Sequence, residues 1–205
     1  MSAIVLWRHA PTPSNTSGLI QGRLDIELND AGRARAAWAA ARIVEQFGTE
    51  LRVISSPLRR AVATAEQLTS LVGGAVDLDE AFTQRSYGAW EGLTWDEVRR
   101  EFPEAWERRE LGLDPEVPGW DGQEQVAARV LAGLERIWDD ERPAVVVTHG
   151  SPITLGLLAA IGEPASSVVL GRVPHAAWVT VRRVESGAWH IESFALGADG
   201  VGKGS

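Results

Sequence analysis

Basic and hydroxyl side chains gather directly after three apolar stretches of the chain. The three clusters are Arg8-His9, Ser55 to Arg60, and His149 to Ser151. An arginine guanidinium matches phosphate oxygens with paired hydrogen bonds, and an imidazole within reach can accept a phosphoryl group. These residue types therefore favour a site for a doubly charged phosphate monoester, provided that the fold brings the three clusters together.

The apolar stretches predict that the fold brings the three clusters together. Short runs rich in Val, Ile and Leu are typical of buried strands, and four occur, at 3–7, 51–55, 75–78 and 144–148. Helix-type segments alternate with them, which predicts an α/β fold, a three-layer α/β/α sandwich with a mostly parallel central sheet. The carboxyl ends of parallel strands share one edge, where ligands bind. We therefore expect the three clusters to meet in one crevice.

Local signals place the helices between these strands. Ser56 is expected to cap a helix that starts at Pro57, Thr94 and Glu97 form a capping box, and Asp121 with Glu124 could form another. The predicted helices span 29–48, 57–71, 95–102, 122–141 and 151–162, and further strands are expected near 177–183 and 188–194. The helices that open at Pro57 and Pro152 would direct their positive N-terminal ends at the crevice.

Composition excludes several classes of protein. The chain of 205 residues has ordinary globular composition, which is consistent with one domain. It contains no cysteine, so disulfides, thiolate metal sites and cysteine catalysis are excluded. A formal net charge of −8 argues against broad binding to nucleic acid, so an anionic ligand needs a local positive cluster. Charge appears after a few N-terminal residues, too early for a signal peptide or a membrane span, so we expect a cytoplasmic protein without a membrane partner.

The four histidines differ in their prospects. His9 and His149 belong to the clusters described above, whereas His175 precedes a predicted strand and could line the crevice. His190 falls on one face of a predicted strand, where a solvated side chain is expected. No pair of histidines has the spacing of metal ligands, so no metal site is predicted.

The sequence resembles the histidine phosphatase superfamily, the phosphoglycerate mutase-like proteins. The similar blocks are LWRHAPTPSN, IQGRLDIELNDAG, SSPLRRAVATA, SYGAWEGLTWDEV and VVVTHGSPI, in the order found in that family. The resemblance covers most of residues 3–160. It implies a phosphatase that works through a phosphohistidine, with no cofactor and no metal, on a small-molecule phosphate ester; a homodimer is a further expectation, since family members are often dimers.

The resemblance also implies roles for individual residues. His9 matches the nucleophile, Arg8 and Arg60 match phosphate ligands, and His149 matches the second histidine of the phosphate pocket. Arg59 is expected to point away or toward a carboxylate. The residues expected to bind substrate or order the pocket are Thr12, Asn15, Gln21, Gly22, Tyr87, Gly150 and His175.

One position departs from the family pattern. The general acid of the family is a Glu, and the alignment of FTQRSYGAWEG places Gln84 there. An amide has no proton to give at neutral pH and cannot act as a base. Five explanations stay open: a weakened enzyme using His149 or water, an acid relocated to Glu80 or Glu91, a substrate with a good leaving group, a noncatalytic relative, or an engineered substitution.

The family also suggests how the chain is divided. We expect a single domain over residues 1–196, in which 82–122 is a helical insertion that forms a lid, and a flexible tail over 197–205. Four tryptophans in the insertion are expected to pack helices onto the sheet, with one or two contacting the substrate. The alternatives to a phosphatase are a cofactor-dependent phosphoglycerate mutase and a noncatalytic phosphoester-binding domain.

Overall fold

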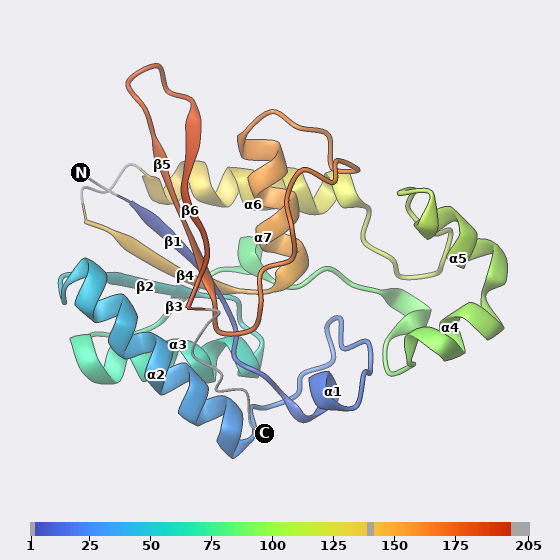
Figure 1. Ribbon diagram of the computed structural model, residues 1–205, viewed down its shortest axis with the longest axis horizontal. Coiled ribbons are helices and arrows are strands. Elements are labelled where there is room, and N and C mark those ends of the chain that lie inside the picture. Colours follow the sequence, from blue (N-terminus) through green and yellow to red (C-terminus); the bar gives the residue numbers. More distant parts are fainter. Residues whose placement is uncertain (1–2, 139–141, 198–205) are drawn as a thin grey trace.

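The computed structural model describes residues 3–138 and 142–197 (Figure 1). The strands are β1 (Ile4–Arg8), β2 (Arg52–Ser55), β3 (Asp77–Leu78), β4 (Ala144–Thr148), β5 (Trp178–Arg183) and β6 (Trp189–Leu196). The helices are α1 (Pro13–Thr16), α2 (Asp30–Phe47), α3 (Arg59–Val72), α4 (Trp95–Glu101), α5 (Pro103–Glu110), α6 (Gln123–Trp138) and α7 (Gly150–Ala160), with short 3-10 turns at Glu80–Phe82 and Gly88–Trp90. The predicted tail lies outside the described residues apart from Gly197, as do residues 139–141 of the fourth predicted helix.

The six strands in the described part of the chain form one mixed sheet in the order β3-β2-β4-β1-β5-β6. The first four strands in this order run parallel, while β5 pairs antiparallel with both β1 and β6. The predicted mostly parallel sheet is confirmed. The predicted burial of 75–78 is wrong, because β3 shrinks to two exposed residues that pair only with β2 at the sheet edge.

Helices cover both faces of this sheet, as expected for three layers (Figure 1). Successive residues of β1 point to opposite faces. Ile4 and Leu6 pack in the core under α6 and α7, whereas Val5 and Trp7 pack in the core under α2 and α3. The strand is therefore buried on both faces, and its first polar residues, Arg8 and His9, emerge at its carboxyl end.

Some helix caps agree with the sequence signals and others do not. Asn29 caps α2 and the Thr94–Glu97 capping box is present at α4. The Ser56 cap is wrong, because α3 begins two residues later with Leu58 as its N-cap residue. The Asp121 cap is also wrong: its carboxylate accepts from the backbone N–H of Ser86.

A carboxylate from another segment stands at the start of α6 instead. The backbone N–H of Gln123 donates to Asp114 Oδ2 over 2.8 Å. Asp114 lies on the connection that follows α5, nine residues before Gln123, which is beyond the reach of a local capping motif.

Residues 82–122 contain α4, α5 and an aromatic core of their own. Trp90 is fully buried there and contacts Trp95 and Trp120, while Trp95 contacts Trp106. These rings pack on one another in a cluster separate from the two cores of the sheet, which corrects the expectation that they fasten helices to the sheet. Figure 1 shows α4 and α5 standing apart from the sheet layers.

Candidate active site

The carboxyl end of β1 is held on both sides by its neighbours. The backbone N–H of His9 donates to Thr148 O of β4, and the N–H of Arg8 donates to Ala177 O beside β5. Ala176 adopts a left-handed conformation with φ 60° and donates to the carbonyls of Arg8 and His9. Such a conformation costs free energy in a residue with a side chain, and the surrounding hydrogen bonds hold it at the site.

The imidazole of His9 is oriented by a carbonyl. Its Nδ1 lies 2.7 Å from Ala10 O, which can only accept, so Nδ1 carries the proton and Nε2 keeps a lone pair. The side chain is 3% exposed. Burial first, and then the neighbouring His149, Arg60, His175 and Arg8, lower the pKa of His9 well below its ordinary value. Both effects favour a neutral imidazole with a nucleophilic Nε2.

Arg60 is fixed on the first turn of α3 by two backbone carbonyls. Its terminal nitrogens donate to Gly22 O and Leu24 O, each over 2.7 Å, and its Nε has no partner among the residues that the structure describes. Burial lowers the pKa of Arg60 to about 10, so the guanidinium stays charged at neutral pH. Arg59 points outward, where it pairs with Glu27. The expectation that Arg59 points toward a carboxylate is confirmed.

His149 lies at the end of β4, with its ring centroid 5.0 Å from that of His9. Its Nε2 is 2.8 Å from Ser56 Oγ, whereas its buried Nδ1 has no partner among the described residues. If the Ser56 hydroxyl donates to Nε2, the ring proton resides on Nδ1 and is available to a ligand. Burial, followed by the charges of Arg60 and Arg8, lowers the pKa of His149.

Arg8 is anchored by the segment that precedes β5. One terminal nitrogen donates to Val173 O over 2.7 Å and the other to His175 Nε2 over 2.8 Å. Since a guanidinium only donates, His175 must carry its proton on Nδ1, which lies 3.2 Å from His9 O. Burial, and next the charge of Arg8, lower the pKa of His175 to about 3. His175 therefore stays neutral and links Arg8 to the backbone of His9.

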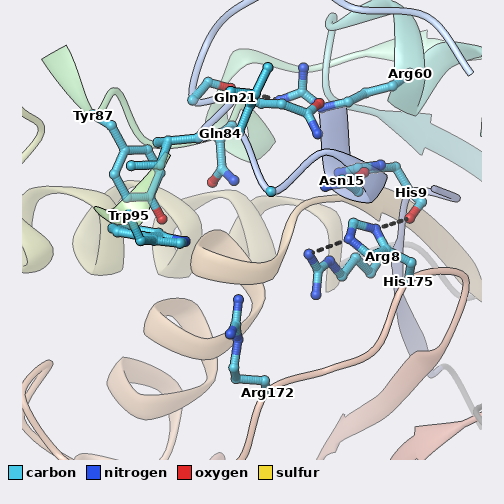
Figure 2. Close-up of a pocket in the computed structure, with 14 residues that line it drawn as sticks. Arg8, His9, Asn15, Gln21, Arg60, Gln84, Tyr87, Trp95, Arg172 and His175 are labelled. Carbon is cyan, nitrogen blue, oxygen red and sulfur yellow. Dashed lines mark hydrogen bonds between the residues drawn. The ribbon is translucent and has the colours of Figure 1, made fainter. Parts of the chain in front are cut away.

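These side chains surround a pocket of about 240 Å³ (Figure 2). It is lined by Arg8, His9, Asn15, Gly18, Leu19, Ile20, Gln21, Gly22, Arg60, Gln84, Tyr87, Trp95, Arg172 and His175. The three arginines give it a positive charge, and no carboxylate belongs to this lining. Such a pocket can bind an oxyanion next to the lone pair of His9 Nε2.

The family model of the histidine phosphatase superfamily (branch 1) matches residues 4–196 of this chain. The chain belongs to the histidine phosphatase superfamily. A glucosyl-3-phosphoglycerate phosphatase of Mycolicibacterium vanbaalenii is 33% identical over 189 residues, which cover 86% of this chain and 82% of that protein. Phosphoglycerate mutase-like protein 4 of Arabidopsis thaliana is 36% identical over 155 residues, covering 73% and 67%.

Solved structures agree with this assignment. A mycobacterial glucosyl-3-phosphoglycerate phosphatase in complex with VO3 superposes with a TM-score of 0.84 at 29% identity, covering 95% of this chain and 99% of that one. An Entamoeba histolytica phosphoserine phosphatase in complex with 3-phosphoglyceric acid gives a TM-score of 0.82 at 25% identity, covering 95% and 96%.

Most residues predicted for this histidine phosphatase site converge on the pocket, and three do not belong to its lining. Thr12 is fully buried, donates to Asn15 Oδ1 and accepts from Gln21 Nε2, so it orders two lining residues. His149 is absent from the lining, and its ring contacts that of His9. Gly150 makes room for Arg8, since a Cβ there would lie 3.3 Å from Arg8 Cζ.

The carboxylates considered as relocated acids lie elsewhere. Glu80 accepts from the Thr83 hydroxyl, and Glu91 accepts from the backbone N–H groups of Arg23 and Tyr87. Neither lines the pocket. Gln84 does, with its Oε1 accepting from the N–H of Arg85 over 3.0 Å, and Figure 2 shows its side chain directed into the pocket.

Several lining residues were not predicted as site residues. Gly18, Leu19 and Ile20 follow α1, and Arg172 precedes β5 in a long connection with no motif to mark it. Trp95 was predicted only as one of four tryptophans of which one or two would contact the substrate. Across residues 3–138 and 142–197, no group of His, Asp or Glu side chains has the arrangement of a metal site, and none of the helices is both long and apolar enough to span a membrane.

Proposed function

We propose that the chain hydrolyses a small-molecule phosphate monoester through a phosphohistidine on His9. The observation that carries the proposal is the fixed tautomer of His9, whose Nδ1 bonds to Ala10 O and whose Nε2 belongs to a pocket lined by three arginines. The phosphatase names of the relatives support the class of reaction, a phosphoric monoester hydrolase.

In the first step, the Nε2 lone pair attacks phosphorus in line with the ester bond. An N–P bond forms, the P–O bond breaks, and its electron pair goes to the leaving oxygen. Arg8 and Arg60 stabilise the equatorial oxygens as charge spreads over them, and the family resemblance gives the same role to His149, whose buried Nδ1 has no partner among the described residues. Each donor is held in place before the substrate binds, so little reorganisation is needed.

In the second step, water attacks phosphorus and the N–P electron pair returns to Nε2. Inorganic phosphate leaves with the oxygen of that water, and its released proton passes to phosphate or solvent. His9 ends neutral, as it began. Burial and the surrounding cations favour this neutral form between turnovers.

Gln84 occupies the position from which an acid would protonate the leaving oxygen. Because its amide cannot give a proton, that oxygen must take one from water, and esters of acidic alcohols such as phenols react fastest. Glu80 and Glu91 lie outside the pocket and cannot replace the missing acid. A substrate with a good leaving group needs no acid, which makes Gln84 compatible with hydrolysis.

The test is capture of the phosphoenzyme. The chain is mixed with a ³²P-labelled aryl phosphate, quenched in alkali, in which phosphohistidine survives, and compared with His9→Ala. His190→Ala serves as the matched control because His190 is an exposed histidine of β6. We expect label and phosphate release with the native chain and His190→Ala, and neither with His9→Ala. Release that persists in His9→Ala would contradict the proposal.

A noncatalytic phosphoester-binding domain is the second candidate, and the absence of a carboxylate from the described pocket lining favours it. It predicts that inorganic phosphate binds while no label reaches His9 from any ester. The same experiment therefore separates the two functions when phosphate binding is measured in parallel by calorimetry. Activation by 2,3-bisphosphoglycerate would instead indicate a phosphoglycerate mutase.

A further inference from the structure

Arg172 lines the same pocket as His9 but comes from the long connection between α7 and β5. Its side chain is exposed, and Figure 2 shows the guanidinium pointing toward the pocket from the side opposite Gln21 and Arg60. Its positive charge reaches the phosphate site, because after burial it is the largest influence lowering the pKa of Arg8 to about 10.

The other arginines near the site are engaged by the protein itself. Arg8 and Arg60 donate to backbone carbonyls, Arg23 pairs with Asp121, and Arg85 pairs with Asp114. Arg172 has neither a hydrogen bond nor an ion pair with any residue in the described ranges. A guanidinium that faces a pocket without a protein acceptor is available for an anion of the ligand.

Part of the pocket lining is apolar and aromatic. Tyr87 and Trp95 pack edge to face at 6.2 Å between ring centroids, and Leu19 and Ile20 belong to the same lining. These groups suit the organic part of an ester. A ligand with its phosphate at His9 would thus leave the organic part against the aromatic rings and any further anion within the field of Arg172.

We propose that Arg172 binds a second anionic group, a carboxylate or a second phosphate, on the alcohol part of the substrate. The inference rests on the proposed function, since it takes the phosphate site at His9 as the anchor of the ligand. It makes the preferred substrate a small phosphate monoester with at least one additional negative charge, and Arg172 the residue that selects it.

The test compares two esters that differ in that charge alone. In 3-phosphoglycerate a carboxylate stands where glycerol 3-phosphate has a neutral hydroxymethyl group. Both are titrated by calorimetry into His9→Ala, which removes no charge because His9 is neutral, and into His9→Ala with Arg172→Gln. Arg99→Gln is the control for loss of a cation, since Arg99 is exposed on α4 and lies outside the pocket lining.

We expect the carboxylate ester to bind about two- to fivefold more tightly than glycerol 3-phosphate, as is typical of one solvent-exposed ion pair. Arg172→Gln should abolish this ratio and Arg99→Gln should preserve it. A ratio that survives Arg172→Gln, or that is absent from the start, overturns the inference. Inhibition constants of the two esters against aryl phosphate turnover by the chain with His9 intact give the same ratios if His9→Ala fails to fold.

Failure of the proposed function is distinguishable from failure of this inference. If inorganic phosphate binds and the two esters bind equally well, the phosphate site stands and the role of Arg172 is wrong. If the ratio depends on Arg172 but no phosphohistidine forms, Arg172 selects the ligand of a noncatalytic domain. If neither phosphate nor ester binds, both proposals are wrong.

Discussion

Replacing Gln84 with Glu should supply the leaving group with a proton. The Oε1 of Gln84 accepts from the N–H of Arg85, so a Glu can keep that bond with one oxygen and direct the other into the pocket. General acid catalysis contributes about 10²–10⁴-fold, or ~2.7–5.4 kcal/mol of barrier at 1.36 kcal/mol per factor of ten. We expect the low end of that range, because the pocket arginines favour the ionised carboxylate and only a bound phosphate dianion offsets them.

The assay is kcat for phosphate release from a series of esters, from acidic phenols to simple alcohols. For alkyl esters Gln84→Glu should raise kcat about 100-fold, and for the most acidic phenol it should change kcat less than about threefold, since that leaving group needs no proton. The dependence of log kcat on leaving-group pKa should therefore be steep in the native chain and shallow in the variant.

Two controls separate the acid from a change in shape or charge. Gln84→Leu removes the amide without adding an acid and should keep the steep dependence. Gln21→Glu puts the same charge at another lining glutamine and should lower activity, because it repels the phosphate. Equal gains from Gln84→Glu for phenol and alkyl esters, or no gain for either, would refute the reasoning that the leaving oxygen lacks an acid.

Two further predictions concern stability. His175 has a pKa of about 3 in the folded chain, so as pH falls below 6.5 the unfolded state binds a proton that the folded state excludes, and the free energy of unfolding falls by about 1.4 kcal/mol per pH unit. Urea denaturation at pH 7.5 and at pH 5 should therefore show that His175→Asn loses about 2 kcal/mol less stability between the two pH values than the native chain does. Equal losses in the two proteins would contradict this prediction. Gly156→Ala should destabilise the fold by about 1–3 kcal/mol, because the added Cβ would lie 2.3 Å from Val130 Cγ1. Gly171→Ala is the control and should leave the melting temperature unchanged, since its Cβ would meet nothing nearer than 4.0 Å. An unchanged melting temperature in Gly156→Ala would show that α6 and α7 can move apart without cost.

The helix cap that depends on local contacts was predicted correctly from the sequence, whereas the caps that involve distant segments of the chain were not. The Thr94–Glu97 capping box forms as predicted because both partners lie within one helical turn. The cap expected at Ser56 fails because α3 begins later, at Arg59, and the Ser56 hydroxyl lies 2.8 Å from His149 Nε2 instead. The cap expected at Asp121 fails because residues of other segments take part. Asp114 satisfies the start of α6, while Asp121 bonds to Ser86 and Arg23.

The sequence by itself determined the centre of the site. Arg8, Arg60 and His149 follow strands that must be parallel, and parallel strands bring their carboxyl ends to one edge, so their convergence with His9 follows from local pattern and topology. The tertiary structure decided the rim, where Arg172 enters from a connection without regular structure and the Tyr87–Trp95 wall belongs to a separate aromatic core. Positions of that kind depend on long-range packing, which no periodicity or spacing in the chain encodes.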